Sequence, residues 1–390
     1  MIRKKNLPVS ALLFAMLLYT AAPVGQLGAE ALGSPEWGYS LDLPEGFALE
    51  NRSGTTRYHF VHQLAPVDLQ IALYPPKQFS AASDALKFVT AQFGSKGDIA
   101  SFEWRRRTAS IAQLSFPAKA GWSLSVELAD KKGWLVMACY TDEARATELE
   151  PLIISTLDSV FSDDGAYFEA GPMTSFAWAK EKPVQVEYRD AKTNIAVPMD
   201  TVDAGANQSV VDREYQLLTA YQTSPLVYAA WKRYYRLIYR DAWGRLSKPA
   251  FLMQTVLPAD PKELTAELLS WTQSFNYERD KDGSDFMNLA DALARKTGDC
   301  DSRSLLLVML LNQMGVDAIL LVSPEYSHAV AAVDCPGEGA RYELGGKKYL
   351  IADTTAKVGA GLIAQDMADS SKWFPVAFYA FPQPDTAEPK

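Results

Sequence analysis

The sequence predicts an α+β protein in which antiparallel sheets pack against helices. Three observations carry this prediction: short stretches that alternate apolar and polar residues, amphipathic helical segments between them, and a buried helix followed by several strands near the carboxyl end. The chain has 390 residues, 48% of them hydrophobic and 22% charged. This length and composition indicate two or three globular domains, and they exclude a disordered or collagen-like chain.

Charge and residue usage narrow the classes of function. The formal net charge is -9, which argues against a nucleic-acid partner. Three cysteines and three histidines are too few for a disulfide scaffold or a four-cysteine zinc site. Any chemistry that needs histidine or cysteine therefore has few candidates in this chain.

Residues 1–31 have the pattern of a secretory signal. Arg3, Lys4 and Lys5 precede an apolar run, and Ala29-Glu30-Ala31 has the small-x-small form of a cleavage site. We therefore expect an exported protein, periplasmic or secreted, with an uncleaved membrane anchor as the alternative. At the other end, the proline-rich residues 382–390 are expected to be a disordered tail.

Residues 35–165 predict an N-terminal α+β domain. Alternating patterns indicate half-buried antiparallel strands, and 83–93 and 148–161 have helical spacing, which we interpret as two helices on one face of the sheet. In outline this pattern resembles small PsbP-like domains. His59 and His62 lie two apart on one strand; without a third ligand they are expected to be surface or packed residues rather than a metal pair. The expected strands are 39–43, 58–62, 67–74, 111–116, 122–128 and 134–140.

Residues 166–262 are expected to connect two domains. Residues 184–197 predict two strands, 210–221 a helix, and Ser224-Pro225 the start of a long aromatic helix that continues to about Leu246. One side of that helix, residues 225–246, is basic. Two interpretations stay open: it binds an anionic surface or a cell-envelope partner, or it pairs with the acidic remainder of the chain. The basic residues are Lys232, Arg233, Arg236 and Arg240.

Residues 263–381 are expected to form the domain that contains the candidate catalytic residues. The stretch Thr297–Arg303 precedes an apolar run that ends at Gly315, which predicts a buried helix with a glycine C-cap. Cys300 falls in the first turn of this helix. There the helix dipole lowers a thiol pKa, and free backbone N–H groups can hold an oxyanion.

The strands that follow supply the two partners of a thiol nucleophile. They are expected at 316–323, 326–333 and in a hairpin around Gly345-Gly346. His328 opens the second strand, and Asp353 ends the last. A cysteine nucleophile, a histidine base and an aspartate that orients it form a catalytic triad for thiol acyl transfer. Taken singly, each residue has an ordinary structural explanation, such as a buried thiol or a turn carboxylate.

On these residues, about 265–366 resembles the transglutaminase-like superfamily, and bacterial cysteine peptidases in particular. Gly298-Asp299-Cys300-Asp301 and the apolar helix match its nucleophile motif, and His328 and Asp353 match its other triad positions. The resemblance implies a papain-like fold, a Cys300–His328–Asp353 triad, and Gln273 as a side chain of the oxyanion hole. Ser302 and Ala329 depart from the common bacterial pattern, which bears on substrate preference.

The resemblance implies a hydrolase that cleaves amide or peptide bonds in a protein or peptide through a thioester. Two alternatives stay open: an amine-dependent cross-linking transglutaminase, and a non-catalytic envelope scaffold. We expect no cofactor and no bound metal. Asp280, Asp282 and Asp285 around Gly283 faintly suggest a calcium loop, but a plain turn fits the spacing better. The oligomeric state is not predicted.

Overall fold

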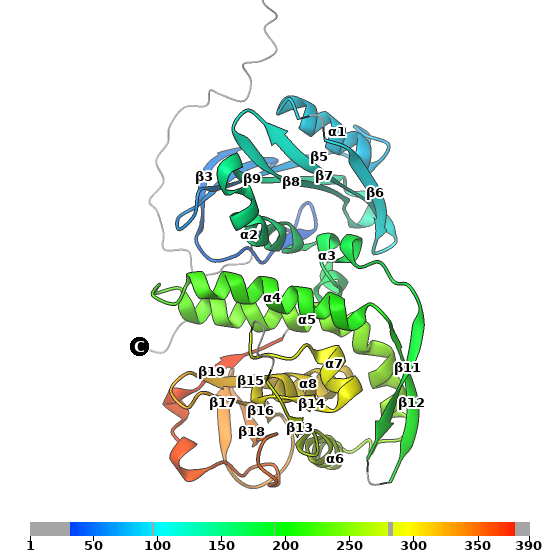
Figure 1. The fold of residues 1–390 in the computed structure, drawn as a ribbon, viewed down its shortest axis with the longest axis vertical. Helices are drawn as coiled ribbons and strands as arrows, with labels where there is room; N and C mark the ends of the chain where they lie inside the picture. Colours follow the sequence, from blue (N-terminus) through cyan, green and yellow to red (C-terminus); the bar gives the residue numbers. More distant parts are fainter. Residues whose placement is uncertain (1–31, 96, 191, 280–283, 379–390) are drawn as a thin grey trace, which may run out of the picture.

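The computed structural model describes residues 32–95, 97–190, 192–279 and 284–378. It has the α+β architecture that the sequence predicts, with antiparallel sheets and helices in separate layers (Figure 1). The proposed signal segment 1–31 and the tail 382–390 lie outside the described residues. Of the helices in the described part, none is both long and apolar enough to cross a membrane.

The N-terminal domain is built on an antiparallel sheet of seven strands in the order β3-β4-β5-β9-β8-β7-β6. All six strands expected from the alternating pattern are present. β3 and β6 were not expected, because both are edge strands with many exposed polar residues. A small sheet of β1 (Leu32–Ser34), β2 (Tyr39–Leu41) and β10 (Val160–Phe161) lies beside the large one. The large sheet comprises β3 (Phe47–Ser53), β4 (Arg57–His62), β5 (Val67–Tyr74), β6 (Ile99–Trp104), β7 (Arg107–Phe116), β8 (Lys119–Glu127) and β9 (Trp134–Asp142).

The two helices of this domain, α1 (Ala82–Gln92) and α2 (Ala146–Asp158), cover opposite faces of the sheet (Figure 1). The expectation that they share one face is therefore wrong. Side chains alternate between faces along a strand, and at the end of β5 buried apolar residues lie on both faces. Leu73 belongs to the core that includes α2, whereas Tyr74 packs in a separate core with α1.

A middle layer of two long helices, α4 (Asp203–Ala220) and α5 (Val227–Gln254), separates the N-terminal and C-terminal sheets (Figure 1). The two expected strands form a hairpin, β11 (Pro183–Arg189) with β12 (Asn194–Asp200). Ser224 lies just before α5, and its Oγ accepts a hydrogen bond from the backbone N–H of Leu226. The short helix α3 (Pro172–Ala177) precedes the hairpin.

The basic side of α5 faces inward. Arg233 and Arg240 are each only 2% exposed. Arg233 pairs with Glu214, Arg236 pairs with Asp42, and Arg240 donates to backbone carbonyl groups of the N-terminal domain. These three cations thus bind within the protein, to α4 and to segments of the N-terminal domain, as the second of the two interpretations describes. An envelope partner at this helix stays a prediction.

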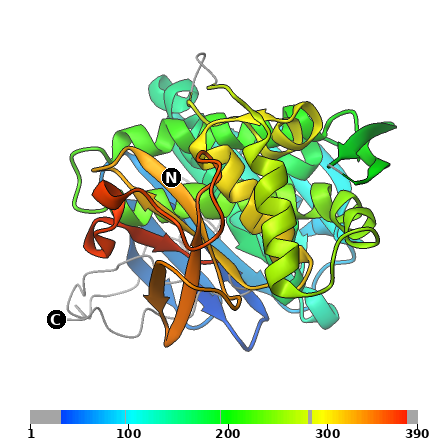
Figure 2. The ribbon, with the colours of Figure 1, turned by 90° about the horizontal axis from the view of Figure 1, so that it is seen from below.

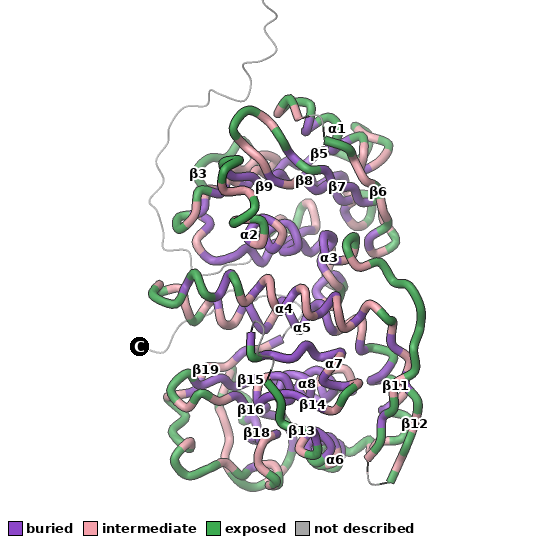
Figure 3. Tube along the Cα trace, viewed as in Figure 1, coloured by how far each residue is buried: buried purple, intermediate pink, exposed green. Residues whose placement is uncertain are grey.

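The C-terminal domain has a five-stranded antiparallel sheet in the order β17-β18-β16-β15-β19. Helix α8 packs along β15 and β16 and is buried all round, as its apolar sequence predicts (Figure 3). Seen from below, the sheet and the helices of this domain lie side by side (Figure 2). Its helices are α6 (Pro261–Gln273), α7 (Leu289–Arg295) and α8 (Cys300–Gln313), and its strands are β13 (Asn276–Tyr277), β14 (Thr297–Gly298), β15 (Ala318–Ser323), β16 (His328–Val333), β17 (Arg341–Leu344), β18 (Lys347–Ala352) and β19 (Phe374–Val376).

Candidate functional site

The first turn of α8 is fixed by local hydrogen bonds. Asp299 is the N-cap: its Oδ1 accepts from the backbone N–H of Ser302 at 2.8 Å and from Ser302 Oγ at 2.6 Å. Gly298 has a φ of +152°, and a Cβ there would lie 3.0 Å from the Cβ of Ser302. Glycine at this position therefore allows the chain to turn sharply and present Cys300 as the first helical residue.

Two buried polar side chains tie this turn to the neighbouring segments. Arg303 donates to the carbonyl oxygens of Gly298 at 2.8 Å, Phe275 at 3.0 Å and Thr354 at 3.3 Å. Ser304 Oγ lies 3.1 Å from both the carbonyl oxygen of Ala329 and the hydroxyl of Thr354. The start of α8 is thus held against the start of β16 and the end of β18.

His328 and Asp353 meet at that junction. His328 Nε2 lies 3.3 Å from Asp353 Oδ2, and their side chains are 11% and 7% exposed. The other carboxylate oxygen, Oδ1, accepts from the backbone N–H and the hydroxyl of Thr355. Burial raises the pKa of Asp353, but the hydrogen bonds from His328 and Thr355 outweigh it and hold the pKa below its usual value. Asp353 is therefore an ionised partner that orients His328.

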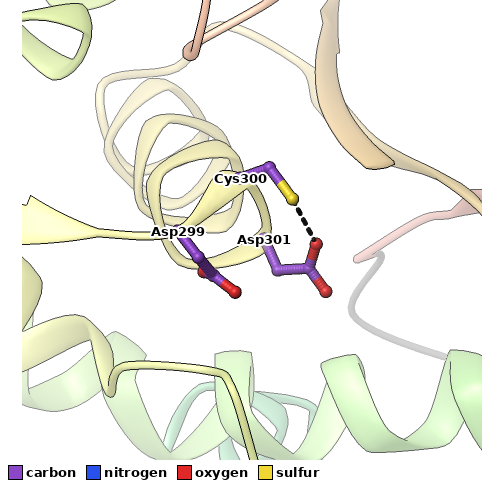
Figure 4. Close-up of side chains that lie close together, drawn as sticks. All are labelled: Asp299, Cys300 and Asp301. Atoms are coloured by element: carbon purple, nitrogen blue, oxygen red, sulfur yellow. Dashed lines mark hydrogen bonds between the residues drawn. The ribbon is translucent and has the colours of Figure 1, made fainter. Parts of the chain in front are cut away.

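Cys300 is 5% exposed, and Figure 4 shows it between Asp299 and Asp301 at the start of α8. Its thiol interacts with the backbone N–H of Ala329, the residue directly after His328. The hydrogen of the thiol, however, is directed to Asp301 Oδ1, 3.2 Å from the sulfur. Within the described hydrogen bonds, none joins Cys300 to His328. The structure brings the three expected triad residues to one junction, but the cysteine–histidine contact is open in this conformation.

The electrostatics of Cys300 differ from the sequence-based expectation. Burial and the nearby carboxylates of Asp301 and Asp299 raise the pKa of the thiol, and the N–H of Ala329 only partly opposes them. The expectation that the helix terminus lowers this pKa is thus reversed. Burial and Asp301 also raise the pKa of Asp299. The thiol is therefore protonated at neutral pH in this conformation.

Asp301 is a site residue that the sequence reasoning missed. Its Oδ2 accepts a hydrogen bond from the hydroxyl of Tyr235, which is fully buried on α5. A hydroxyl of the middle layer thus binds the carboxylate that accepts the thiol hydrogen of Cys300. The sequence did carry a signal, because Asp301 follows Cys300 directly, but its partner lies 66 positions away.

Gln273 has a different role from the expected oxyanion donor. Its Nε2 donates to the carbonyl oxygens of Asp353 at 2.8 Å and Val358 at 2.9 Å, so both of its N–H bonds are engaged. It positions the segment after β18. Among the described residues, the backbone N–H groups of Cys300 and Asp301 have no hydrogen-bond partner, and they are the donors that remain for an oxyanion.

Among the described residues, one group has the spacing of potential metal ligands. Asp299, Cys300 and Asp301 each offer an atom within 4.8 Å of the others' atoms (Figure 4). Asp280 and Asp282 of the suggested calcium loop lie outside the described residues, and Asp285 pairs with Arg279 at 3.5 Å. His59 is held by Glu50 and Asp68. Cys139, Cys300 and Cys335 are all free and buried.

Comparison with known proteins adds little. No protein-family profile matches the chain, and no curated protein matches it. Cyanobacterial PsbP (CyanoP) from Synechocystis is 12% identical and covers 37% of this chain and 98% of its own, with a TM-score of 0.29. A crystal structure from Bacteroides thetaiotaomicron is 9% identical and covers 83% of this chain and 88% of its own, with a TM-score of 0.21. Both TM-scores are too low to bear on fold or function.

Proposed function

We propose that this chain is an exported, transglutaminase-like thiol hydrolase that cleaves amide bonds of a protein or peptide through a thioester on Cys300. One observation carries the proposal. The nucleophile at the tip of α8 adjoins the residue that follows His328, and His328 is hydrogen-bonded to a buried, ionised Asp353. Export rests on the sequence of residues 1–31.

The reaction begins when the proton of the Cys300 thiol passes to His328. Asp353 occupies Nε2 of His328, so Nδ1 is the nitrogen that takes this proton. The sulfur then bonds to the substrate carbonyl carbon, and the carbonyl oxygen becomes an oxyanion held by the free backbone N–H of Cys300. When the C–N bond breaks, His328 returns the proton to the amine, which leaves.

A water molecule completes the cycle. It attacks the thioester carbonyl carbon and gives a proton to His328, the C–S bond breaks, and His328 returns the proton to the sulfur. The net change is one amide and one water converted to one carboxylic acid and one amine. If a second amine attacks in place of water, the same steps produce a new amide.

The position of the Cys300 thiol before the reaction adds one step to this mechanism. Because the thiol donates to Asp301, the sulfur must leave that carboxylate before His328 can accept its proton. A rotation about the Cα–Cβ bond of Cys300 moves the sulfur without moving α8. Hydrogen bonds at catalytic sites often close only when the substrate binds.

The test compares three chains: the wild type, Cys300→Ala, and Cys335→Ala, which removes another buried free cysteine. Each is incubated with a peptide library, with and without an added primary amine, and the products are identified by mass spectrometry. The proposal predicts cleaved peptides with the wild type and Cys335→Ala and none with Cys300→Ala. Amine-adducted peptides would identify a transferase instead. Equal products from all three chains would contradict the proposal.

A non-catalytic scaffold is the second candidate, and one observation favours it. The thiol is buried, and its pKa is raised by Asp301 and Asp299 as well as by burial. Under this reading the C-terminal domain is a rigid support for the layers above it. Unchanged peptides in every reaction of the library experiment would support the scaffold.

A further inference from the structure

A hollow of about 400 Å³ lies on the N-terminal sheet, beside α1. That volume falls in the range of pockets that bind small molecules. α1 packs mainly on β6, β7 and β8. The described residues place no helix over β3, β4 and β5 on the same face, and the hollow follows this boundary. Figure 1 shows α1 at the end of the molecule away from α8, so the hollow is separate from the Cys300 site.

The part of the floor nearest α1 is apolar because small side chains meet there. Ala72 on β5 lies opposite Val136 on β9, and two positions along the register Ala138 lies on the same face opposite Gln70, the polar residue of the floor. These residues leave room that a larger side chain would fill. Val89 and Phe93 of α1 close one wall. A floor of this kind favours an alkyl chain over a polar ligand.

An aromatic cluster forms the end wall beside α1. Tyr74 lines the hollow, and its ring makes edge contacts with Phe79 at 5.2 Å and Phe88 at 5.9 Å between centroids. Phe88 is 45% exposed although it is large and apolar. The apolar surface of the hollow therefore continues outward to solvent, which gives a ligand an entrance.

The guanidinium of Arg57 places a positive charge beside the apolar surface of the hollow. Arg57 lies opposite Ala72 in the register of β4 and β5. Its guanidinium stacks 4.3 Å above the Tyr74 ring, and its Nη1 donates at 2.8 Å to the carbonyl oxygens of Thr56 and Leu73. Over the described residues, no carboxylate forms an ion pair with Arg57.

Two further basic side chains line the hollow, Arg52 and His59, and Arg52 is exposed to solvent. His59 lines the hollow, but it is held between Glu50 at 2.9 Å and Asp68 at 2.8 Å. A hydrogen bond to Asp68 raises the pKa of His59, so its own charge is already balanced within the protein. Arg57 is therefore the part-buried cation that a ligand in the hollow would meet, because it is held in place over the Tyr74 ring, whereas Arg52 is exposed.

We propose that this hollow binds an amphipathic carboxylate, with its alkyl chain on Ala72 and Val136 and its carboxylate on Arg57. The alkyl chain gains from leaving water, and the immobilised guanidinium presents free N–H donors to an anion. A neutral or cationic amphiphile of the same length has no partner for its head group. This site does not depend on the thiol chemistry, so Cys300→Ala is expected to bind the ligand as the wild type does.

The test is calorimetric titration of the full chain with octanoate, octan-1-ol and octyltrimethylammonium, all below their aggregation concentrations. Octanoate is expected to bind one per chain, about tenfold more tightly than the other two. Decanoate is expected to bind more tightly still, by up to roughly fourfold per added methylene. Arg57→Leu should remove the preference for octanoate, whereas Lys87→Leu, which removes an exposed cation of α1 outside the hollow, should keep it.

A second variant tests whether the ligand binds inside the hollow, by filling part of its volume. Ala72→Leu fills the floor and should abolish binding of all three probes; its fold is checked by circular dichroism. If this variant does not fold, the comparison of head groups with Arg57→Leu decides alone. No octanoate binding at millimolar concentration, or equal binding in Arg57→Leu, would overturn the proposal. A dimer in sedimentation that excludes octanoate would also overturn it, since a second copy would then occupy the hollow.

Discussion

The sulfur of Cys300 lies 3.2 Å from Oδ1 of Asp301, so the thiol donates its hydrogen to the carboxylate of the next residue. The other oxygen of that carboxylate is held by Tyr235 of α5. In the proposed mechanism, this hydrogen bond keeps Cys300 in its neutral thiol form before the reaction begins. It also makes the reactivity of Cys300 depend on a residue from another layer of the molecule.

The first prediction concerns the charge of Asp301. Asp301→Asn removes a negative charge beside the sulfur, so the thiolate is less disfavoured and the pKa of Cys300 falls. We expect iodoacetamide to alkylate Cys300 about tenfold faster at pH 8, measured by mass spectrometry of the peptide that contains it. Asp334→Asn, a carboxylate paired with Lys347, is the matched control and should not change the rate. Equal rates in both variants would contradict the role of Asp301.

The second prediction compares two adjacent tyrosines of α5. Tyr235 donates to the carboxylate of Asp301, whereas Tyr234 donates to the neutral hydroxyl of Ser284 at 3.3 Å. A hydrogen bond to a charged group contributes more, so Tyr235→Phe should lower the free energy of unfolding by about 2 kcal/mol and Tyr234→Phe by about 1 kcal/mol. Urea denaturation measures both. The reverse order would show that Asp301 does not depend on Tyr235.

The third prediction concerns Arg303, which ties the tip of α8 to three backbone carbonyls. Arg303→Met keeps most of the side-chain volume but removes the Arg303 donor from the carbonyl oxygens of Phe275 and Thr354, and we expect a loss of about 3 kcal/mol in the free energy of unfolding. Arg295→Met is the control, because Arg295 is exposed and pairs with Glu278 at 3.5 Å; it should lose less than about 1 kcal/mol. Similar losses in both variants would contradict the positioning role of Arg303.

The fourth prediction is a pH dependence from Glu45. Burial raises the pKa of Glu45 to about 7, and in the described hydrogen bonds its Oε1 has no partner. The folded chain therefore binds this proton more tightly than the unfolded chain, so the contribution is complete below the ordinary carboxyl pKa. It is lost as the pH rises to about 7.

Glu45→Gln removes this titration. Relative to the wild type, the variant should gain roughly 3 kcal/mol in free energy of unfolding between pH 4.5 and pH 7.5. Chemical denaturation at several pH values measures this difference. Glu103→Gln, an exposed carboxylate on β6, should follow the wild type at every pH. A difference that does not change with pH would mean that folding leaves the pKa of Glu45 unchanged.

The sequence predicted the structure best for helices and strands that are buried along their whole length. The run after Cys300 is apolar on all sides, and it forms the buried helix that this pattern predicts. The strands that carry His328 and precede Asp353 also lie where expected, because β-branched and small apolar residues continue through them. The positions of the proposed triad residues could therefore be predicted from local patterns.

Contacts between distant segments could not be predicted in this way. The basic side of α5 has the spacing of a solvated face, and only the tertiary structure places Asp42 and Glu214 against it. Gln273 has the residue type of an oxyanion donor, but its direction is set by the carbonyl of Asp353, 80 positions away. Tyr235, the partner of Asp301, lies 66 positions away, so a local sequence pattern cannot predict that contact either.

The central claim is that Cys300 forms a thioester with a substrate acyl group. The most direct measurement mixes the chain with a cleavable peptide found in the library, quenches the reaction in acid within one turnover, and locates added acyl mass by proteolysis and mass spectrometry. The account predicts the acyl mass on the peptide that contains Cys300, and its loss in Cys300→Ala. An acyl mass elsewhere, or product formation by Cys300→Ala at the wild-type rate, would contradict it.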